Sequence, residues 1–496
     1  MSHQKQRLGP VMFPSPTLPA DLKEQKLLGI YAQRDMDLFM LRVKAPGGRI
    51  ATDQWRRLAR LAATFTPDYP LHLTTRQDIE LHGVPPDAVV KVLEGVAEAG
   101  LTTIGACGDT PRNITLCPGG GMCVGHGDLL PLLLAVKTYL EGLPDIHALP
   151  RKFKISFSGC REACAQPWIN DLGFVRMAGP LTPPTSVLAR PGPCEFPGLT
   201  PAIDLRRRGE AASLGPPIFD VIGAGSLGFK PGTGVLLARE VGLSDVFACV
   251  LAAIRIFQRH GDREHRMRAR LRHVRERLGN EAFQQLFDAE LRQARKEGGF
   301  PEVRLPPAPA SSIQIARLSL VKGDLTPAQA ERLADLCDAH AAWSNLDNQQ
   351  GVRIFGASAE PLREAIEHDG LLAGLLEPLS IVTCPGVTWC SKGIADTRAM
   401  AERLREVLSQ SRAGRAVVVC ISGCPNGCAQ SGVAPIGLAG FTRTVGGVRT
   451  ECFRMVARGG LGKSPVLARE VAAAPSAEVP RLVAQLLENW DSFIAI

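Results

Sequence analysis

Four cysteines in the C-terminal part of the chain fall into two closely spaced pairs. Cys384 and Cys390 are separated by five residues, and Cys424 and Cys428 by three, in a Gly/Pro/Asn turn that follows the β-branched run VVVCIS. Thiolates are ligands for soft metal centres, and four of them are the number that a [4Fe-4S] cluster needs. A four-cysteine zinc site is the alternative, although zinc ligands usually come in tighter pairs on small knuckles. The spacing favours the cluster.

The elements that position these cysteines occur twice, because the chain contains two similar halves. Internal repeats predict a repeated architecture, and here four matches follow one another in the same order. The Pro-rich segment EVRLPPAPASS at 302–312 joins the two halves. The matching segments are 47–62 with 322–337, 115–123 with 382–390, 155–166 with 419–430, and 234–241 with 464–471.

Short stretches rich in β-branched residues and bounded by turn signals predict strands, with helices between them. The strand candidates are LFMLRVKA at 38–45, LHLTTRQDIELHGV at 71–84, RKFKISFSG at 151–159 and AVVVCIS at 416–422. This mixture predicts an α+β fold with pseudo-twofold symmetry, in which each half has a small α/β region and a larger one that carries the cysteines. The expected regions are 1–100, 101–301, 302–375 and 376–496.

Composition indicates a globular protein of two or three domains. The chain has 496 residues, of which 45% are hydrophobic and 21% charged, and no apolar run is long enough to span a membrane. The N-terminus lacks the apolar core of a signal peptide, so we expect a soluble, cytoplasmic protein without a membrane partner. In a reducing compartment, clustered members of the 14 cysteines are better explained by metal ligation or catalysis than by disulfides.

The net charge of +8 favours an acidic partner or a polyanionic ligand. The most basic stretch, 255–279, is predicted to be a helix with Arg and His on nearly every turn. Nucleic acid is not the expected partner, because stacking needs interleaved aromatic residues and only 5% of the chain is aromatic. A solvated helix face, an anchor for an acidic ligand and a docking site for an acidic protein remain as interpretations.

The segment VIGAGSLG at 221–228 satisfies the pattern GxGxxG after a predicted strand. A dinucleotide site needs a full helix after the glycines, whereas FKPGTG interrupts any helix here. We therefore expect no nicotinamide or flavin site. The repeat places VARGGLGKS at 456–464 in the matching position.

The two cysteine pairs, with the second inside SGCPNGC, resemble the sulfite and nitrite reductases that carry siroheme bridged to a [4Fe-4S] cluster. Segments of the first half are similar to the siroheme-facing segments of that family: MLRVKAPGG at 40–48, TTRQDIELHG at 74–83, RNITLC at 112–117 and LPRKFK at 149–154. The resemblance covers nearly the whole chain. It implies a duplicated sulfite reductase-like fold, in which each half has a small ferredoxin-like α/β region and a larger α/β region that binds siroheme and the cluster.

The resemblance also implies roles for single residues. Cys428 would bridge the cluster to the siroheme iron. The anion would bind on an open face lined by Arg42, Arg112, Lys152 and Lys154, and the two lysines are expected on one side of one strand. The residues expected to contact siroheme are Arg76, His82, Asn113, Gly225, Asn426 and Lys463.

The first half keeps a second cysteine set, which resembles the dissimilatory sulfite reductases. Its loop SGCREAC departs from SGCPNGC, so a second [4Fe-4S] cluster and vestigial thiols are both open interpretations. The members of this set are Cys117, Cys123, Cys160 and Cys164.

The resemblance implies the six-electron reduction of sulfite to sulfide, with electrons from ferredoxin or a similar acidic carrier. Nitrite reduction to ammonia on the same centre is the close alternative, although Lys154 favours sulfite because the nitrite enzymes tend to place Asn there. A non-catalytic iron-sulfur electron-transfer subunit is a third hypothesis, and the four cations argue against it. We expect one catalytic centre, because the second-half positions that match Arg112, Lys152 and Lys154 are Leu379, Ala416 and Val418.

Overall fold

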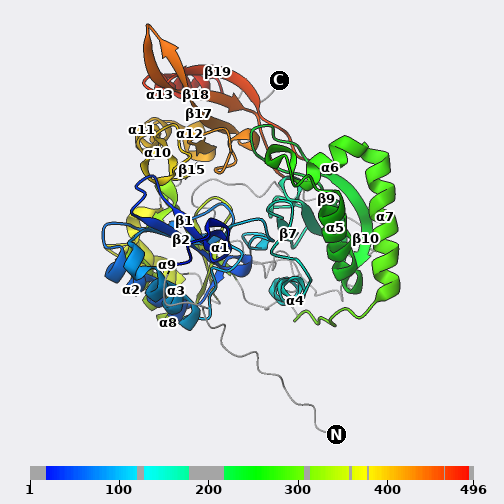
Figure 1. Cartoon of the computed structure of the whole chain (residues 1–496). Coiled ribbons are helices and arrows are strands. Elements are labelled where there is room, and N and C mark those ends of the chain that lie inside the picture. The colour runs from blue at the N-terminus through cyan, green and yellow to red at the C-terminus, as the bar shows by residue number, and fades with distance from the viewer. Residues whose placement is uncertain are drawn as a thin grey trace, which may run out of the picture.

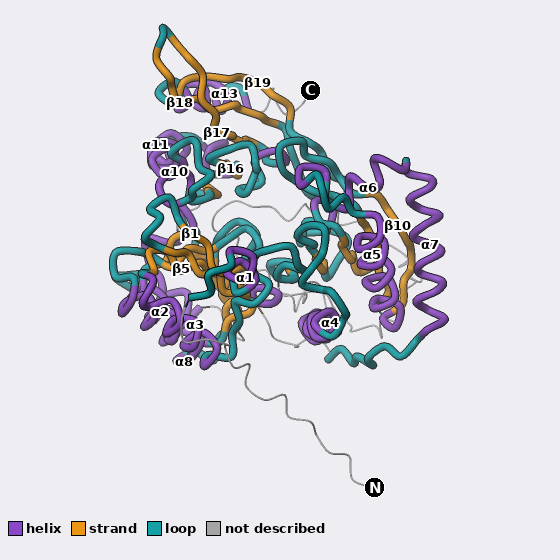
Figure 2. Tube along the Cα trace, viewed as in Figure 1, coloured by secondary structure: helices purple, strands orange, loops and turns teal. Residues whose placement is uncertain are grey.

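The computed structural model describes residues 18–119, 128–177, 217–306, 313–356, 360–376, 379–462 and 464–490. Within them the strands form two antiparallel sheets, which belong to the two small regions and are called the small sheets, and two mixed sheets, which belong to the two larger regions and are called the larger sheets (Figure 1). The small sheets and their helices lie together at one side, and the larger sheets lie beside and above them (Figure 2). The chain is therefore an α+β protein with two copies of each kind of layer.

The first small sheet has the strand order β1-β2-β5-β4-β12 and the second has the order β11-β14-β13-β3. Amphipathic helices cover both sheets, and apolar strand residues of both halves enter one shared core. The first sheet contains β1 (Ile30–Ala32), β2 (Phe39–Lys44), β5 (Asp78–Val84) and β4 (Leu71–Leu73), with α2 (Thr52–Phe65) and α3 (Val89–Glu98). The second contains β11 (Ile313–Leu318), β14 (Val352–Gly356) and β13 (Trp343–Leu346), with α8 (Pro327–Ala339) and α9 (Glu360–Glu367).

Each small sheet borrows one strand from the other half of the chain. Strand β3 (Arg49–Ile50) pairs with β13, and β12 (Asp324–Leu325) pairs with β4. These two strands occupy matching positions in the repeat, so the exchange is reciprocal. Trp55 of α2 adds a cross-half hydrogen bond from Nε1 to Ser344 Oγ at 2.8 Å. The two ferredoxin-like regions consequently form one unit.

The two larger sheets share one topology: three parallel strands followed by two antiparallel ones. The first contains β6 (Thr115–Leu116), β7 (Ile155–Ser158), β8 (Leu172–Met177), β9 (Ile218–Gly223) and β10 (Val235–Gly242). The second contains β15 (Ser380–Thr383), β16 (Val418–Ser422), β17 (Ile436–Val445), β18 (Val448–Ala457) and β19 (Arg469–Pro475). The cysteine loops follow the carboxyl ends of the parallel strands, where open α/β sheets bind their ligands.

Helices complete the two larger regions. The first contains α4 (Leu130–Glu141), α5 (Val246–His260), α6 (Leu271–Leu278) and α7 (Asn280–Glu297). The second contains α10 (Gly386–Trp389), α11 (Thr397–Ser409), α12 (Arg412–Ala416) and α13 (Val479–Glu488), while α1 (Leu22–Leu27) precedes the first small sheet. No helix in the described parts of the chain is long and apolar enough to cross a membrane.

Three local expectations need correction. The basic stretch 255–279 is not one helix, because α5 ends before Gly261 and α6 begins at Leu271. The candidate strand 71–84 is two strands around a turn at 74–77, where Gln77 adopts a positive φ. Lys152 and Lys154 precede β7 rather than lying in it, although the backbone is extended enough for Phe153 to form an isolated bridge with Pro111.

The glycine segment at 221–228 behaves as expected for a region without a dinucleotide site. Strand β9 ends at Gly223 and the chain turns back into the antiparallel β10, so no helix follows the glycines. Several arginines of the basic stretch form ion pairs with acidic residues of the same chain. These pairs are Arg255 with Glu297, Arg259 with Glu290, Arg266 with Asp109, Arg270 with Asp171, and Arg272 with Glu276.

Candidate active site

The second-half cysteines converge where β15 and β16 end. The backbone N–H of Gly423 donates to Cys384 Sγ at 3.1 Å, and Thr397 Oγ1 donates to the Cys384 carbonyl at 2.6 Å. Burial raises the pKa values of Cys384, Cys390 and Cys424, and the negative charge of Cys428 raises all three further. Four thiols within electrostatic reach of one another disfavour four simultaneous negative charges, and a bound cationic centre removes that conflict.

Four thiols on two separate loops suit a cluster of four irons, which is wider than one metal ion and needs its thiolates further apart than zinc does. In the part of the chain that the structure describes, no three His, Cys, Asp or Glu side chains are grouped tightly enough to hold one ion. Backbone N–H groups also point at Cys384, Cys390 and Cys424, as expected for thiolate ligands.

Residues of the first half lie against the Cys428 loop. Thr75 Oγ1, in the turn between β4 and β5, donates to the Cys428 carbonyl at 3.1 Å. Burial, with Arg112 and Arg270 nearby, lowers the pKa of Lys152 to about 7, and the Cys428 thiolate acts in the opposite direction. Lys152 therefore lies within electrostatic reach of the thiol that is expected to bridge two metal centres.

Lys154 lies in the same group of cations. Burial lowers its pKa well below the ordinary lysine value, and Arg76, Lys152 and Arg270 lower it further. The compensating acid is Asp171, which accepts from the Lys154 backbone N–H at 2.8 Å and pairs with Arg270 at 2.6 Å. Asp171 and, at Arg76, the buried Asp78 face these four cations, so positive charge remains in excess and an anionic ligand would offset it.

Arg42 and Arg112 meet at one carbonyl. Arg42 pairs with Glu80 at 2.6 Å and its Nη1 reaches the Ala106 carbonyl at 3.4 Å, to which Arg112 Nη1 also donates. Arg112 Nη2 donates to the Gly108 carbonyl at 2.6 Å. The Nε of Arg112 is buried without a partner among the described residues. Both guanidinium groups are thus held in place, and Arg112 retains an unused donor.

Arg76 and Asn113 are hydrogen-bonded to each other, and Arg76 is also hydrogen-bonded to the loop before β8 of the first larger sheet. Arg76 Nη2 donates to the Asn113 carbonyl at 2.6 Å and Nη1 to Asn170 Oδ1 at 2.9 Å, while Asn113 Nδ2 donates to the Ala45 carbonyl at 2.8 Å. Burial lowers the pKa of Arg76 to about 10. Arg76 Nε and Asn113 Oδ1 are buried and have no partner within the described ranges. The unsatisfied donor of Arg76, beside excess positive charge, fits a ligand with many carboxylates, as siroheme has, whereas Asn113 Oδ1 can only accept.

His82 acts through its neighbours. Its Nε2 is 3.0 Å from Glu80 Oε2 and its Nδ1 is 3.1 Å from Gln33 Oε1. Its ring lies 4.5 Å from the ring of Trp389, the residue before Cys390. Burial lowers the pKa of His82, against the opposing effect of Glu80. His82 therefore positions Glu80, and through it Arg42, against the second-half cysteine loop.

Two further residues named from the sequence have structural roles. A Cβ on Gly225 would lie 2.0 Å from the Trp168 carbonyl, so close backbone packing requires glycine there. Asn426 donates to the Cys424 thiol, which makes it a neighbour of the cluster ligands. Lys463 and Cys123 lie outside the described residues.

The first-half cysteines have local hydrogen bonding similar to that of the second-half cysteines, but three of the four cations expected to bind the anion beside the second set have no equivalents at the matching positions. The Gly159 N–H donates to Cys117 Sγ at 3.4 Å, as Gly423 does to Cys384. Leu379, which matches Arg112, is buried and apolar. The counterpart of Arg42 is Arg317, which is engaged by Asp347 at 2.7 Å. The cation-lined face is thus present at the second-half cysteines alone among the described residues.

Several residues of this site were not predicted from the sequence. Arg270 was visible only as part of a basic stretch, and Asp171 and Trp389 carried no local signal. Asp78 and Glu80 did have a local signal in the sequence. They alternate with the apolar residues of DIELHGV, and this period-two pattern puts charged side chains on one face of a strand. That face turned out to be buried at 3–4% exposure.

Comparisons with known proteins find related sequences and a related structure. Residues 107–295 and 377–493 match the family model "Nitrite and sulphite reductase 4Fe-4S domain", and residues 31–99 match "Nitrite/Sulfite reductase ferredoxin-like half domain". The chain is 27% identical to an assimilatory ferredoxin-dependent nitrite reductase of Haloferax mediterranei, covering 96% of this chain and 84% of the relative. It is 24% identical to a ferredoxin sulfite reductase of Mycobacterium tuberculosis, covering 81% and 70%. The structure of Mycobacterium tuberculosis NirA shares the fold, with a TM-score of 0.74 at 22% identity over 94% of this chain and 86% of that one.

Proposed function

This chain belongs to the nitrite and sulphite reductase family, an oxidoreductase family of the siroheme and [4Fe-4S] type, and we propose that it reduces sulfite to sulfide with electrons from a ferredoxin. The observation that carries the proposal is that the first half lies against the Cys428 loop, where Thr75 Oγ1 donates to the Cys428 carbonyl at 3.1 Å and Lys152 lies within electrostatic reach of the thiol. Cations of the first half face the second-half thiol expected to bridge the two cofactors. A non-catalytic electron-transfer subunit would have no use for this arrangement.

In this proposal the cofactors, when bound, would supply the iron centre and the six electrons that the reduction needs. Cys384, Cys390, Cys424 and Cys428 would hold the cluster. Arg76, whose Nε is a buried donor without a partner among the described residues, would face the carboxylates of siroheme, with Asn113 beside it. Arg42, Arg112, Lys152 and Lys154 attract the anion, offset charge that develops as oxygen leaves, and hold protons near it.

Nitrite is the second candidate substrate. The relatives from Haloferax mediterranei and from maize are named as nitrite reductases. The number of cations facing the anion nevertheless supports sulfite as the main substrate.

The proposed electron donor is an acidic carrier of the ferredoxin type. Relatives from both substrate groups are named as ferredoxin-dependent. The chain's net charge of +8 complements such a partner. Association should therefore weaken as ionic strength rises, because salt screens charges at contact distances.

The test begins with anaerobically purified protein, its visible spectrum and its iron content. Turnover of sulfite and nitrite is then measured with reduced ferredoxin for wild type, Lys154→Asn and the control Lys91→Asn, whose lysine is exposed on α3. We expect Lys154→Asn to raise the nitrite-to-sulfite ratio of kcat/KM by about tenfold, roughly 1.4 kcal/mol, and Lys91→Asn to leave it unchanged. Absence of siroheme, or a wild type that reduces neither anion, would contradict the proposal.

A further inference from the structure

We propose that Asp78 and Lys44, with the cavity that opens beside Lys44, form a route by which protons reach the anion-binding face. This inference rests on the proposed function, because only a reaction that consumes protons needs such a route. In sulfite reduction each departing oxygen takes two protons to leave as water. The protons must cross a region in which the cations and carboxylates are largely buried.

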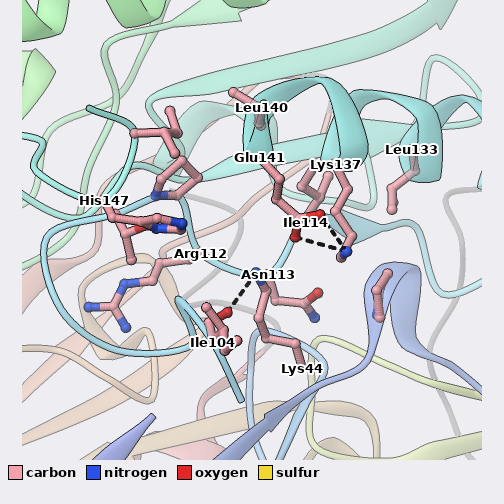
Figure 3. A pocket seen from close by; sticks show the side chains of 14 residues that line it. Lys44, Ile104, Arg112, Asn113, Ile114, Leu133, Lys137, Leu140, Glu141 and His147 are labelled. Carbon is pink, nitrogen blue, oxygen red and sulfur yellow. Dashed lines mark hydrogen bonds and ion pairs between the residues drawn. The ribbon is translucent and has the colours of Figure 1, made fainter. Parts of the chain in front are cut away.

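The cavity lies between α4, the loop before β6 and the end of β2. Its volume is about 30 Å³, which suits one or two water molecules. Glu141 and His147 at its rim are exposed, whereas Lys44 and Asn113 at its inner end are buried (Figure 3). At the rim Glu141 also pairs with Lys137 at 2.8 Å. The cavity therefore connects solvent-exposed titratable groups with a buried amine.

Lys44 is the buried end of this connection. Lys44 is 7% exposed, and its Nζ donates to the Ile104 carbonyl at 3.3 Å (Figure 3). It forms no ion pair among the described residues. Burial lowers its pKa to about 8, with Glu141 acting to raise it and Lys137 to lower it. An amine with this pKa both gives up and regains a proton near neutral pH.

Asp78 stands directly opposite Lys44 in the β2–β5 pairing. Opposed residues project to the same face of a sheet, with Cβ atoms about 5 Å apart. Asp78 is 3% exposed, and its Oδ1 is buried without a partner among the described residues. The next pair on the same face is Arg42 with Glu80. The carboxyl of Asp78 therefore lies between the inner end of the cavity and the anion-binding arginine.

The charged groups around Asp78 come from three elements. Arg42 and Lys44 face it from β2, Glu80 from β5, and Arg76 from the preceding turn. Burial is the largest influence and raises the pKa of Asp78 to about 6, against the opposing effect of the three cations. Arg112, from the loop before β6, also lies within electrostatic reach. A carboxyl with this pKa, which none of its cations holds in an ion pair, can exchange its proton near neutral pH.

The steps balance in protons and move no electrons. No hydrogen bond or ion pair joins Lys44 to Asp78 among the described residues, so Lys44 passes its proton to the Asp78 carboxylate through an intervening water. Lys44 is reprotonated by cavity water, which exchanges with solvent at Glu141 and His147. Asp78 passes its proton to the departing oxygen, directly or through one water. The electrons come from the cofactors of the proposed reaction, so no further reductant is needed.

The test compares Asp78→Asn, Asp78→Glu and Lys44→Met with Asp87→Asn, a control at an exposed position near the start of α3. Asp78→Asn retains the shape but cannot donate a carboxyl proton. We expect its kcat for sulfite to fall by about 100-fold, with iron and siroheme content unchanged and KM within twofold. Asp78→Glu should recover part of kcat, Lys44→Met should lower it and increase the solvent deuterium isotope effect, and Asp87→Asn should match wild type.

A second readout does not depend on turnover. Infrared difference spectra of the holoprotein between pH 5 and pH 8 should contain a protonated-carboxyl band that shifts in D₂O and titrates near pH 6, and Asp78→Asn should lack it. If wild type lacks siroheme, the proposed function fails while this band still reports on Asp78. If wild type reduces sulfite but Lys44→Met and Asp78→Asn keep half or more of kcat with wild-type isotope effects, the proton route is wrong. The same conclusion follows from infrared spectra that are identical in wild type and Asp78→Asn.

Discussion

Gln166 and Gln430 form a reciprocal pair, in which Nε2 of each side chain donates to Oε1 of the other at 2.7 Å. They occupy matching positions in the two cysteine loops, and both have positive φ angles. The pair therefore marks the pseudo-twofold axis. Nearby, Trp168 Nε1 of the first half donates to the Gly462 carbonyl of the second at 2.8 Å. The loops that carry the two cysteine sets are thus in direct contact, and each stabilises the position of the other.

Removing either side chain of this pair should destabilise the contact between halves. Gln430→Ala or Gln166→Ala leaves one amide without a partner, at a cost of about 1–3 kcal/mol. The double variant should lose less free energy of unfolding than the sum of the two single variants, because either single substitution already removes the shared hydrogen bonds. Thermal midpoints of the holoproteins test this, with Gln485→Ala on the exposed face of α13 as the control. Fully additive losses would mean that the pair has no coupling.

Cys428→Ser should remove both cluster and activity. The thiolate is expected to serve two metal centres, and a serine hydroxyl is too hard and too weakly acidic to replace it. Iron analysis, the visible spectrum and sulfite turnover measure the outcome. Cys452→Ser, a buried cysteine in β18 outside the ligand set, is the matched control. A full cofactor spectrum with retained turnover in Cys428→Ser would refute the bridging role.

The single-centre hypothesis predicts opposite results for the two halves. Lys152→Ala with Lys154→Ala should abolish sulfite turnover while both cofactors remain bound, because the anion-binding face loses half of its four cations. Cys164→Ser should leave substantial activity in whatever protein folds, since the matching face carries Leu379 and Val418. Iron content of Cys164→Ser tells a second cluster from vestigial thiols. Half or more of the turnover in the double lysine variant would require a second working site.

Asp347 should stabilise the second small sheet in a pH-dependent way. This carboxyl is buried, and although burial opposes it, Arg317 and Arg353 lower its pKa to about 2. A lowered carboxyl pKa contributes stability above the unfolded value of about 4 and loses it as pH falls towards 2, in total about 2–3 kcal/mol. Asp347→Asn should therefore lower the thermal midpoint equally at pH 7 and pH 5. The difference from wild type should shrink below pH 4, and a difference that grew there would contradict the assignment.

The sequence alone determined the features that depend on short spacing. The cysteine pairs and the duplication are local patterns, because each motif is continuous within a strand and the loop next to it. They were sufficient to predict the fold class and, through the resemblance, the family. Arg42, Arg112, Lys152 and Lys154 were named from that resemblance, and their roles stay predictions. Alignment of the two halves, which needs no coordinates, also indicated that the second half lacks counterparts of Arg112, Lys152 and Lys154.

Only the tertiary structure decided which segments meet. The exchange of β3 and β12, the Gln166–Gln430 pair and the position of Lys152 at Cys428 join residues far apart in the chain. The opposition of Asp78 to Lys44 depends on strand register. Periodicity reports the face to which a side chain belongs, but pairing partners are set by burial and backbone hydrogen bonding over the whole fold. For that reason the charged face of β5 could be recognised as a pattern in the sequence, while its proposed role beside the anion-binding face could not.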